Sequence, residues 1–273
     1  MRRTNINTLS GTAMPHSVSI IGSGNVATHM ARALYAVGYD IRQVFSLHFD
    51  HAARLARQVE AMPIDQVAQL DLTADTYLLA ITDDALYDLA SALRPIVASR
   101  ADHPLFLHTS GSTPADVLSP ISSRYGVVWS PQTFVRNQQM DYSQLPLCIE
   151  GSSPEVIAAI EQLFSPVSTH LFHLDSQQRR WAHLAAVMVN NFGNAVNALA
   201  QEVATAHGID FSMLRPLAEA TVEKISQGPL WPQQTGPAIR RDQKTLQAQR
   251  QLLADKPQLL QLYNLLTDII QQH

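Results

Sequence analysis

The sequence has almost no cysteine, little charge and no long apolar run. Its single cysteine, Cys148 among 273 residues, excludes internal disulfides and any zinc site built from several cysteines. A reducing cytoplasm is therefore the location we expect. Charged residues make up 15% of the chain and the net charge is −4, which disfavours a nucleic-acid partner because phosphate binding needs a positive surface. No segment approaches the roughly 18 apolar residues of a membrane span, so a soluble enzyme is the class we expect.

The amino terminus also lacks a targeting signal. Residues 1–15 contain two arginines but not the apolar segment that a secretory signal requires. We expect them to form a disordered leader, and Met14, which stands just before the first predicted strand, is an alternative start of the chain.

Residues 16–175 alternate between short apolar runs and amphipathic stretches. The runs at 17–21, 41–46, 76–81, 105–108, 126–129, 146–149 and 168–173 predict strands. Helices are expected at 25–37, from Asp50 as an N-cap residue, at 85–97 and at 154–164. Because the loops open at the carboxyl ends of the strands, the pattern predicts an α/β fold with a doubly wound parallel Rossmann sheet.

Residues 176–273 have helical periodicity and predict a second, all-helical C-terminal domain. No proline interrupts the stretch from Ser176 to His207, so we expect one helix about 45 Å long that ends at Gly208. Further helices are expected at 211–226, 238–254 and 257–272, with Pro237 in the first turn of the second. The domain boundary is predicted near residue 175.

The strongest motif is Gly22-Ser23-Gly24-Asn25-Val26-Ala27, which lies between a predicted buried strand and a predicted helix. The dinucleotide-binding fingerprint requires this context. Gly22 permits a tight turn, Gly24 lets the backbone approach a pyrophosphate, and Ala27 stands where helix and strand pack closely. Free N–H groups and the helix dipole would then bind the phosphates. The alternative is an ordinary glycine turn of an α/β fold.

The second predicted strand ends without the carboxylate that an NAD site places on the ribose hydroxyls. Ser46, Leu47 and His48 stand there instead, and none of them repels a 2′-phosphate. We therefore favour NADP(H) over NAD(H), with Ser46 and His48 as phosphate contacts. His48 is equally consistent with an exposed loop histidine.

The turn after residues 76–81 carries Thr82, Asp83 and Asp84. Ligands lie beyond the carboxyl ends of the strands in open α/β sheets, so Thr82 and Asp83 are expected to contact the cofactor. Alternatively, at least one of the two aspartates only caps the helix that follows.

The next two predicted strands also end in polar turns. His108-Thr109-Ser110-Gly111-Ser112 groups hydroxyls and a histidine, which suits hydrogen bonds to a nicotinamide or a carboxylate substrate. We expect Thr109 and Ser110 at the cofactor, Ser112 at the substrate, and His108 as a candidate proton donor. Gln132 and Thr133 of Ser130-Pro131-Gln132-Thr133-Phe134 would face the same crevice. A turn with local backbone bonding and a plain proline turn are the alternatives.

The long predicted helix carries His183, Asn190, Asn191 and Asn194. Spacings of seven and eleven residues keep Asn190 and Asn194 on the stripe of His183. Buried asparagines need partners, so either a substrate or facing backbone is expected to bond them. His183 is a candidate proton donor, with Asn191 orienting the substrate, or it is a structural histidine.

Arg240 follows the turn Thr235-Gly236-Pro237. We expect it to bind a carboxylate or phosphate of the substrate. A solvated charge on a capped helix is the alternative, and it is favoured for Arg241. No metal is assigned to the site.

The segments GSGNVA, ITDDAL, HTSGS, SPQTF, HLAAVMVNNFGNAVNALA and TGPAIRRD, in this order, resemble a family of Rossmann-like NADP oxidoreductases in the 6-phosphogluconate dehydrogenase-like superfamily. Relatives in this superfamily include deazaflavin-dependent NADP reductases, pyrroline-5-carboxylate reductase and ketopantoate reductase. The resemblance covers about residues 16–270. It implies an NADP-binding domain, a helical domain, an active site in the cleft between them, and a homodimer formed through the helical domains.

Two positions depart from these relatives. Leu47 stands where NADP-binding relatives commonly have a basic residue. No lysine lies between Ser176 and His207, although the β-hydroxyacid dehydrogenase branch uses a lysine on this helix as its catalytic acid. His183 is the nearest replacement.

Two functions are consistent with these motifs. In the first, NADPH donates a hydride to a carbonyl or imine of a small acid, such as ketopantoate or another 2-keto acid, while His183 or His108 supplies the proton. In the second, the protein binds NADP as a sensor or scaffold without turnover, which the missing lysine supports. Neither a nucleic acid nor a membrane is expected as a partner.

Overall fold

The seven predicted apolar runs and one further short strand form an eight-stranded sheet with the order β3-β2-β1-β4-β5-β6-β7-β8. The computed structural model describes residues 16–97 and 104–273, so the expected leader at 1–15 lies outside the described residues. The strands are β1 (Ser17–Ile21), β2 (Asp40–Phe45), β3 (Met62–Ile64), β4 (Thr76–Leu79), β5 (Leu105–His108), β6 (Tyr125–Trp129), β7 (Leu147–Gly151) and β8 (Leu171–His173).

The sheet confirms the doubly wound α/β prediction with two differences. Neighbouring strands are parallel except for β6 and β7, which are antiparallel. The short strand β3 was not predicted, because its three residues Met-Pro-Ile are too few to show a periodicity. Both differences lie away from the central strands β1, β4 and β5.

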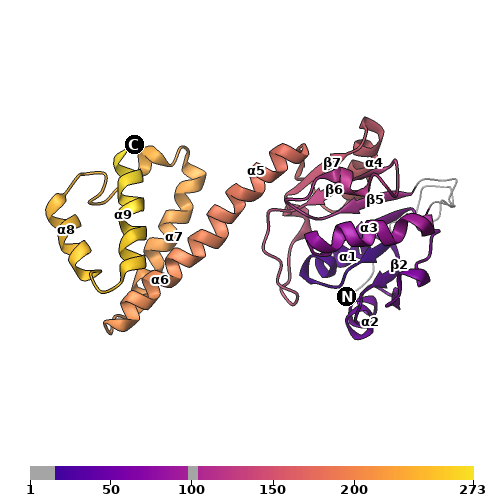
Figure 1. Cartoon of the computed structure of the whole chain (residues 1–273), viewed down its shortest axis with the longest axis horizontal. Coiled ribbons are helices and arrows are strands. Elements are labelled where there is room, and N and C mark those ends of the chain that lie inside the picture. Colours follow the sequence, from indigo (N-terminus) through magenta and orange to yellow (C-terminus); the bar gives the residue numbers. More distant parts are fainter. Residues whose placement is uncertain (1–15, 98–103) are drawn as a thin grey trace, which may run out of the picture. The chain divides into compact units, whose positions relative to one another are not determined.

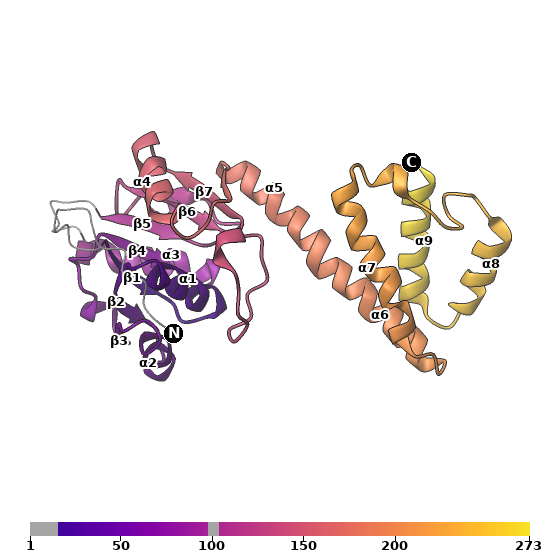
Figure 2. The same ribbon diagram turned by 180° about the vertical axis from the view of Figure 1, so that it is seen from behind.

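Helices cover both faces of the sheet (Figures 1 and 2). The helices α1 (Asn25–Ala36), α2 (Phe49–Ala56) and α4 (Pro154–Phe164) pack on one face, and α3 (Asp83–Val97) packs on the other. Successive residues of a strand point to opposite faces of the sheet and pack against the helices on those faces. Ile20 belongs to the core under α1, whereas Ile21 belongs to the core under α3.

Asp50 does not have the capping role that was expected of it. The N-cap of α2 is His48, and Asp50 lies in the first turn, where it still favours the positive end of the helix dipole. Asp83 and Asp84 both lie in the first turn of α3. Short 3₁₀ turns at Val67–Gln69, Ala115–Leu118 and Tyr142–Gln144 complete this part of the chain.

The chain divides into two compact units, Met1–Val187 and Met188–His273. The division falls inside the helical segment that begins at Ser176, so the domain ranges 16–175 and 176–273 stay a prediction. This segment is not one uninterrupted α-helix: α5 (Ser176–Ala186) is followed by a π-helical stretch at Val187–Phe192 and then by α6 (Gly193–Ala206). Periodicity does not predict this local change of winding, because both forms are compatible with the same residues.

The second unit is helical, as predicted. Besides α6 it contains α7 (Arg215–Glu223), α8 (Gln243–Leu252), α9 (Pro257–Gln271) and 3₁₀ turns at Phe211–Leu214, Lys224–Gln227 and Trp231–Gln233. No helix among the described residues is long and apolar enough to cross a membrane.

The start of α8 corrects the expected helix at residue 238. Pro237 is not in its first turn, because α8 begins only at Gln243, where the Asp242 carboxylate accepts the N–H of Thr245 at 3.1 Å. Arg241 has a φ of 53°, and this left-handed conformation separates the turn before it from the helix.

Candidate functional site

The glycine loop is built as a dinucleotide fingerprint requires. Gly22 has a φ of 120°, and a Cβ there would lie 2.2 Å from the carbonyl oxygen of Ala80, so only glycine allows β1 to turn this close to the end of β4. Among the described residues, no atom outside Gly24 and its two chain neighbours lies within 4 Å of the place that a Cβ on Gly24 would take, which leaves room above the start of α1. Ala27 is fully buried where α1 packs on the sheet.

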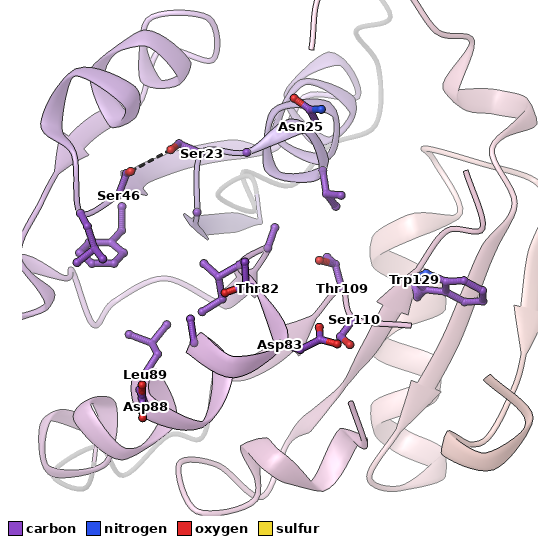
Figure 3. A pocket seen from close by; sticks show the side chains of 18 of the residues that line it. Ser23, Asn25, Ser46, Thr82, Asp83, Asp88, Leu89, Thr109, Ser110 and Trp129 are labelled. Carbon is purple, nitrogen blue, oxygen red and sulfur yellow. Dashed lines mark hydrogen bonds between the residues drawn. The ribbon is translucent and has the colours of Figure 1, made fainter. Parts of the chain in front are cut away.

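A pocket of about 900 Å³ lies over this loop and over the carboxyl ends of the neighbouring strands (Figure 3). All of its lining residues belong to the first unit. The predicted site residues that line it are Gly22, Ser23, Gly24, Asn25, Val26, Ser46, His48, Thr82, Asp83, Thr109, Ser110, Ser112 and His183.

The pocket does not include every predicted residue. Ala27, His108, Gln132 and Thr133 are not among its lining residues. Asn190, Asn191, Asn194 and Arg240 belong to the second unit, and their predicted roles stay predictions. Leu47, Gly111 and Trp129 line the pocket without having been assigned a role there; their positions at strand ends were the only available signal.

The two serines that follow β1 and β2 bond to each other at one corner of the pocket. The Ser23 hydroxyl donates to the Ser46 hydroxyl at 2.9 Å (Figure 3). Ser46 also accepts the N–H of His48 at 3.4 Å, while Leu47 between them is 80% exposed. No carboxylate from β2 enters this corner, so it presents hydroxyls, an imidazole and an apolar side chain to a ribose.

The charged side chains of the lining are acidic. Asp83 and Asp88 line the pocket, and no lysine or arginine is among its lining residues. The Ser112 hydroxyl donates to the Asp83 carboxylate, which ties the start of α3 to the turn after β5. A bound phosphate would therefore depend on the backbone N–H groups and the positive end of α1.

His108 lies beneath this turn. It is fully buried, its Nε2–H donates to the Pro114 carbonyl at 3.2 Å, and its Nδ1 accepts the N–H of Ser110 at 3.1 Å. Burial, followed by the positive charge of Arg179, lowers the pKa of His108 to about 4. It is therefore neutral at pH 7, and its contacts suit it to shape the turn. Its candidate role as a proton donor stays a prediction.

His183 reaches the pocket from α5. Its ring meets Trp129 edge to face, with centroids 5.7 Å apart and planes at 76°. A Cβ on Gly111 would lie 2.7 Å from Cδ2 of His183, so the absent side chain is what lets this histidine approach the turn. Trp129, Gly111 and His183 thus form one wall of the pocket, from β6, the β5 turn and α5.

The loop that carries Gln132 and Thr133 is held next to α1. Three consecutive carbonyl groups, those of residues 134–136, accept hydrogen bonds from Asn25 at 2.9 Å, His29 at 2.8 Å and Arg32 at 2.8 Å. These donors lie on one stripe of α1. The loop is therefore anchored beside the glycine loop, although neither Gln132 nor Thr133 lines the pocket.

No group of three or more histidine, cysteine, aspartate or glutamate side chains within 16–97 and 104–273 is arranged to hold a metal ion. The described site instead offers backbone N–H groups, hydroxyls, two carboxylates and two imidazoles. This set is suited to hydrogen bonding with a nucleotide and to proton transfer at one end.

Similar proteins are consistent with this geometry. Residues 5–130 match the family description "Rossmann-like domain", and residues 145–270 match "Domain of unknown function (DUF2520)". A crystal structure from Bacteroides fragilis, described as a "putative NADP oxidoreductase", is 35% identical, with a TM-score of 0.85 over 95% of this chain and 99% of that one.

More distant structures share the fold alone. An imine reductase from Streptomyces aurantiacus is 14% identical, with a TM-score of 0.67 over 93% of this chain and 95% of that one. A pyrroline-5-carboxylate reductase from Coxiella burnetii is 16% identical, with a TM-score of 0.55 over 93% and 96%. Among curated protein sequences, none matches the chain.

Proposed function

Because the chain belongs to the NADP oxidoreductase family that joins a Rossmann-like domain to the DUF2520 domain, we propose that it binds NADP(H) and transfers a hydride to a carbonyl or imine of a small acid. The observation that carries this proposal is the pocket over the glycine loop, at the carboxyl edge of the sheet. Its volume of about 900 Å³ suits a dinucleotide, and the chemistry of hydride transfer comes from the cofactor.

Each part of the pocket has a role in this proposal. Residues 22–26 bind the pyrophosphate, Ser46 and His48 bind the 2′-phosphate, and Thr82, Asp83, Thr109 and Ser110 bind the riboses and the nicotinamide. Ser112 and His183 face the substrate end, with His183 as the proton donor. The remaining substrate contacts are Gln132, Thr133, Asn190, Asn191, Asn194 and Arg240, of which Asn191 orients the reacting group and Arg240 binds the acid group.

The choice of cofactor is tested at Ser46. Ser46→Asp places a carboxylate beside the ribose, where it repels a 2′-phosphate but accepts bonds from ribose hydroxyls. NADPH affinity should fall by about tenfold or more, while NADH affinity is kept or improves. Calorimetric titration with both nucleotides measures this, and NADH is the internal control. Equal affinities of the unmodified protein for NADPH and NADH would refute the preference, and no binding of either would refute the proposed function.

The proton-donor role is tested at His183. With a 2-keto acid or imine substrate, His183→Ala should lower turnover far more than NADPH affinity, because hydride transfer stalls without a proton. His207→Ala, at an exposed histidine that caps the C-terminus of α6, is the matched control. Equal losses of turnover and of affinity for His183→Ala would contradict the role.

A second candidate is an NADP-binding sensor or scaffold without turnover. The observation that favours it is the absence of any lysine between Ser176 and His207. A panel of keto acids, including ketopantoate, and cyclic imines separates the two functions by NADPH absorbance. Tight NADPH binding with no oxidation across the panel favours the sensor.

We also propose a homodimer formed through the second unit. Among its described residues only Ala204, Ala238, Leu246 and Thr267 are buried. Its exposed large apolar side chains are Met188, Val189, Phe192, Val196, Ile209, Met213, Leu217, Val222, Ile225, Leu230, Trp231, Leu252, Leu265 and Leu266. So much apolar surface needs a cover, and a second copy of this chain provides one. Sedimentation should give twice the chain mass; a stable monomer would refute the proposal.

The expected cytoplasmic location is kept as part of this proposal. Cys148 is a free, buried thiol, and burial raises its pKa to about 11, so it is an unreactive residue suited to a reducing compartment. Fractionation of cells that express the full chain measures the location, and recovery outside the cytoplasm would refute it.

A further inference from the structure

Arg179, in the first turns of α5, has no role in the function proposed above, yet every N–H group of its guanidinium donates a hydrogen bond. It is 1% exposed. Its Nη1 donates to the carbonyl oxygens of Ser110 at 2.9 Å and Thr113 at 2.8 Å. Its Nη2 donates to Glu150 at 2.8 Å and to the Ser176 hydroxyl at 3.2 Å, and its Nε donates to Glu150 at 3.3 Å. All five N–H groups of the side chain have a partner.

These bonds join three separate segments. Glu150 belongs to β7, Ser176 begins α5, and Ser110 lies in the turn after β5. The second oxygen of Glu150 accepts the Ser176 hydroxyl at 2.6 Å, and Ser176 in turn accepts the N–H of Ala115 at 3.2 Å. A planar fork with five fixed donors can hold all three segments at once, whereas a lysine ammonium has three donors at one point.

The same segments carry one wall of the pocket. Ser110, Gly111 and Ser112 line it from the turn, and His183 lines it from α5, four residues after Arg179. Residues four apart in a helix lie on one face. The guanidinium therefore fixes the turn and the histidine relative to each other from behind the wall, without lining the pocket itself.

We infer that Arg179 is a positioning residue for this site: its bonds to the two turn carbonyls hold Gly111 and the His183 ring in contact. The inference rests on the proposed function in one respect: the positioned wall matters for catalysis only if NADPH binds against it and His183 donates the proton there. A purely structural role is the competing account, because a buried ion pair is also consistent with tethering β7 to α5.

The two accounts separate in a variant that removes both charges. Breaking a buried pair by one substitution destabilises a protein, whereas replacing both partners by apolar groups is often neutral. Glu150→Leu with Arg179→Met therefore keeps the protein folded under either account but removes the bonds to the turn. Arg179→Lys is the second variant. It keeps a positive charge beside Glu150, but an ammonium there cannot also bond the carbonyl groups of both Ser110 and Thr113. Arg180→Met, at the exposed neighbouring position, is the matched control.

The first readout is the fluorescence of Trp129, which needs no ligand. The chain has three tryptophans, so Trp181→Phe with Trp231→Phe leaves Trp129 as the reporter. Contact with the His183 side chain sets the surroundings of the indole, so His183→Ala gives the reference emission without this contact. We expect the double variant and Arg179→Lys to shift the emission at least halfway to this reference, and Arg180→Met to leave it unchanged.

The second readout is NADPH affinity. We expect about a tenfold loss in the double variant and a smaller loss in Arg179→Lys, with thermal unfolding close to that of the parent. A double variant with parental emission and NADPH affinity within twofold of the parent would overturn the inference. Failure of the parent to bind NADPH would refute the proposed function instead, and the emission would still decide the positioning role.

Discussion

His108 makes the stability of the first unit depend on pH. Its pKa falls from 6.5 to about 4 in the folded chain, first through burial and then through the charge of Arg179. The unfolded chain therefore takes up a proton before the folded chain does, so the stabilisation is complete above about pH 6.5 and is lost as the pH falls towards 4. At about 1.4 kcal/mol per pKa unit, the difference is roughly 2.5 kcal/mol at pH 4.5. Because the ring is fully buried, solvent screening does not reduce this figure.

His108→Gln removes the titrating group while keeping a donor for the Pro114 carbonyl. At pH 7 the variant should be less stable than the parent, by about 1–2 kcal/mol for the altered bonds. At pH 4.5 the difference in unfolding free energy between the variant and the parent should vanish or change sign, because only the parent is destabilised by protonation of a buried histidine.

Urea unfolding at several pH values, followed by circular dichroism, measures this crossing. Leu107→Met, the preceding and equally buried residue, carries no titratable group and should be destabilised equally at both pH values. A gap between His108→Gln and the parent that is the same at pH 7 and pH 4.5 would show that the histidine does not titrate below its ordinary range, and the assigned bonding would be wrong.

Three further substitutions test local geometry. Gly22→Ala should lower the free energy of unfolding by about 3 kcal/mol or more and abolish NADPH binding, because its Cβ would lie 2.2 Å from the Ala80 carbonyl oxygen. Gly38→Ala is the control: its φ is positive but the space around it is open, so it should lower the free energy of unfolding by only about 1 kcal/mol. Similar losses of stability for both variants in urea unfolding would contradict the clash. Gly111→Ala should displace the His183 ring and the Trp129 indole, because its Cβ would lie 2.7 Å from Cδ2 of His183 and 2.9 Å from Cε2 of Trp129. A changed Trp129 emission in a chain without the other tryptophans measures this, and unchanged emission would contradict the contact. Asp242→Ala should lower the free energy of unfolding through loss of the α8 cap, and Asp242→Asn, which keeps an acceptor, should not.

The sequence by itself determined the sheet and the edge at which the polar turns gather. Buried parallel strands are continuous apolar runs, and the turns after them must lie at one edge. Residues as distant as Ser23, Ser46 and Ser110 therefore line one pocket, and their roles towards a cofactor stay a prediction. The dinucleotide fingerprint could be recognised in the sequence because residue 22 must be glycine: its positive φ and its close approach to another strand leave no room for a side chain.

Sequence periodicity did not predict the π-helical stretch at Val187–Phe192 or the late start of α8 at Gln243. Both depend on small differences between backbone conformations that the same side chains tolerate. The chain order likewise gave no reason to separate His108 from the pocket, because whether a strand-end side chain faces the pocket or lies beneath the turn depends on the pleat and on the loop that covers it.

Only the tertiary structure decided what lies behind the pocket wall. Arg179 and Arg180 are adjacent and chemically identical in the sequence, yet one is buried and makes five hydrogen bonds while the other is exposed. The difference comes from Glu150, 29 residues away on β7, and from carbonyl groups of a turn that no side-chain pattern encodes. Local spacing therefore determines which residues share a face, while the partners of a buried charge depend on segments that only folding brings together.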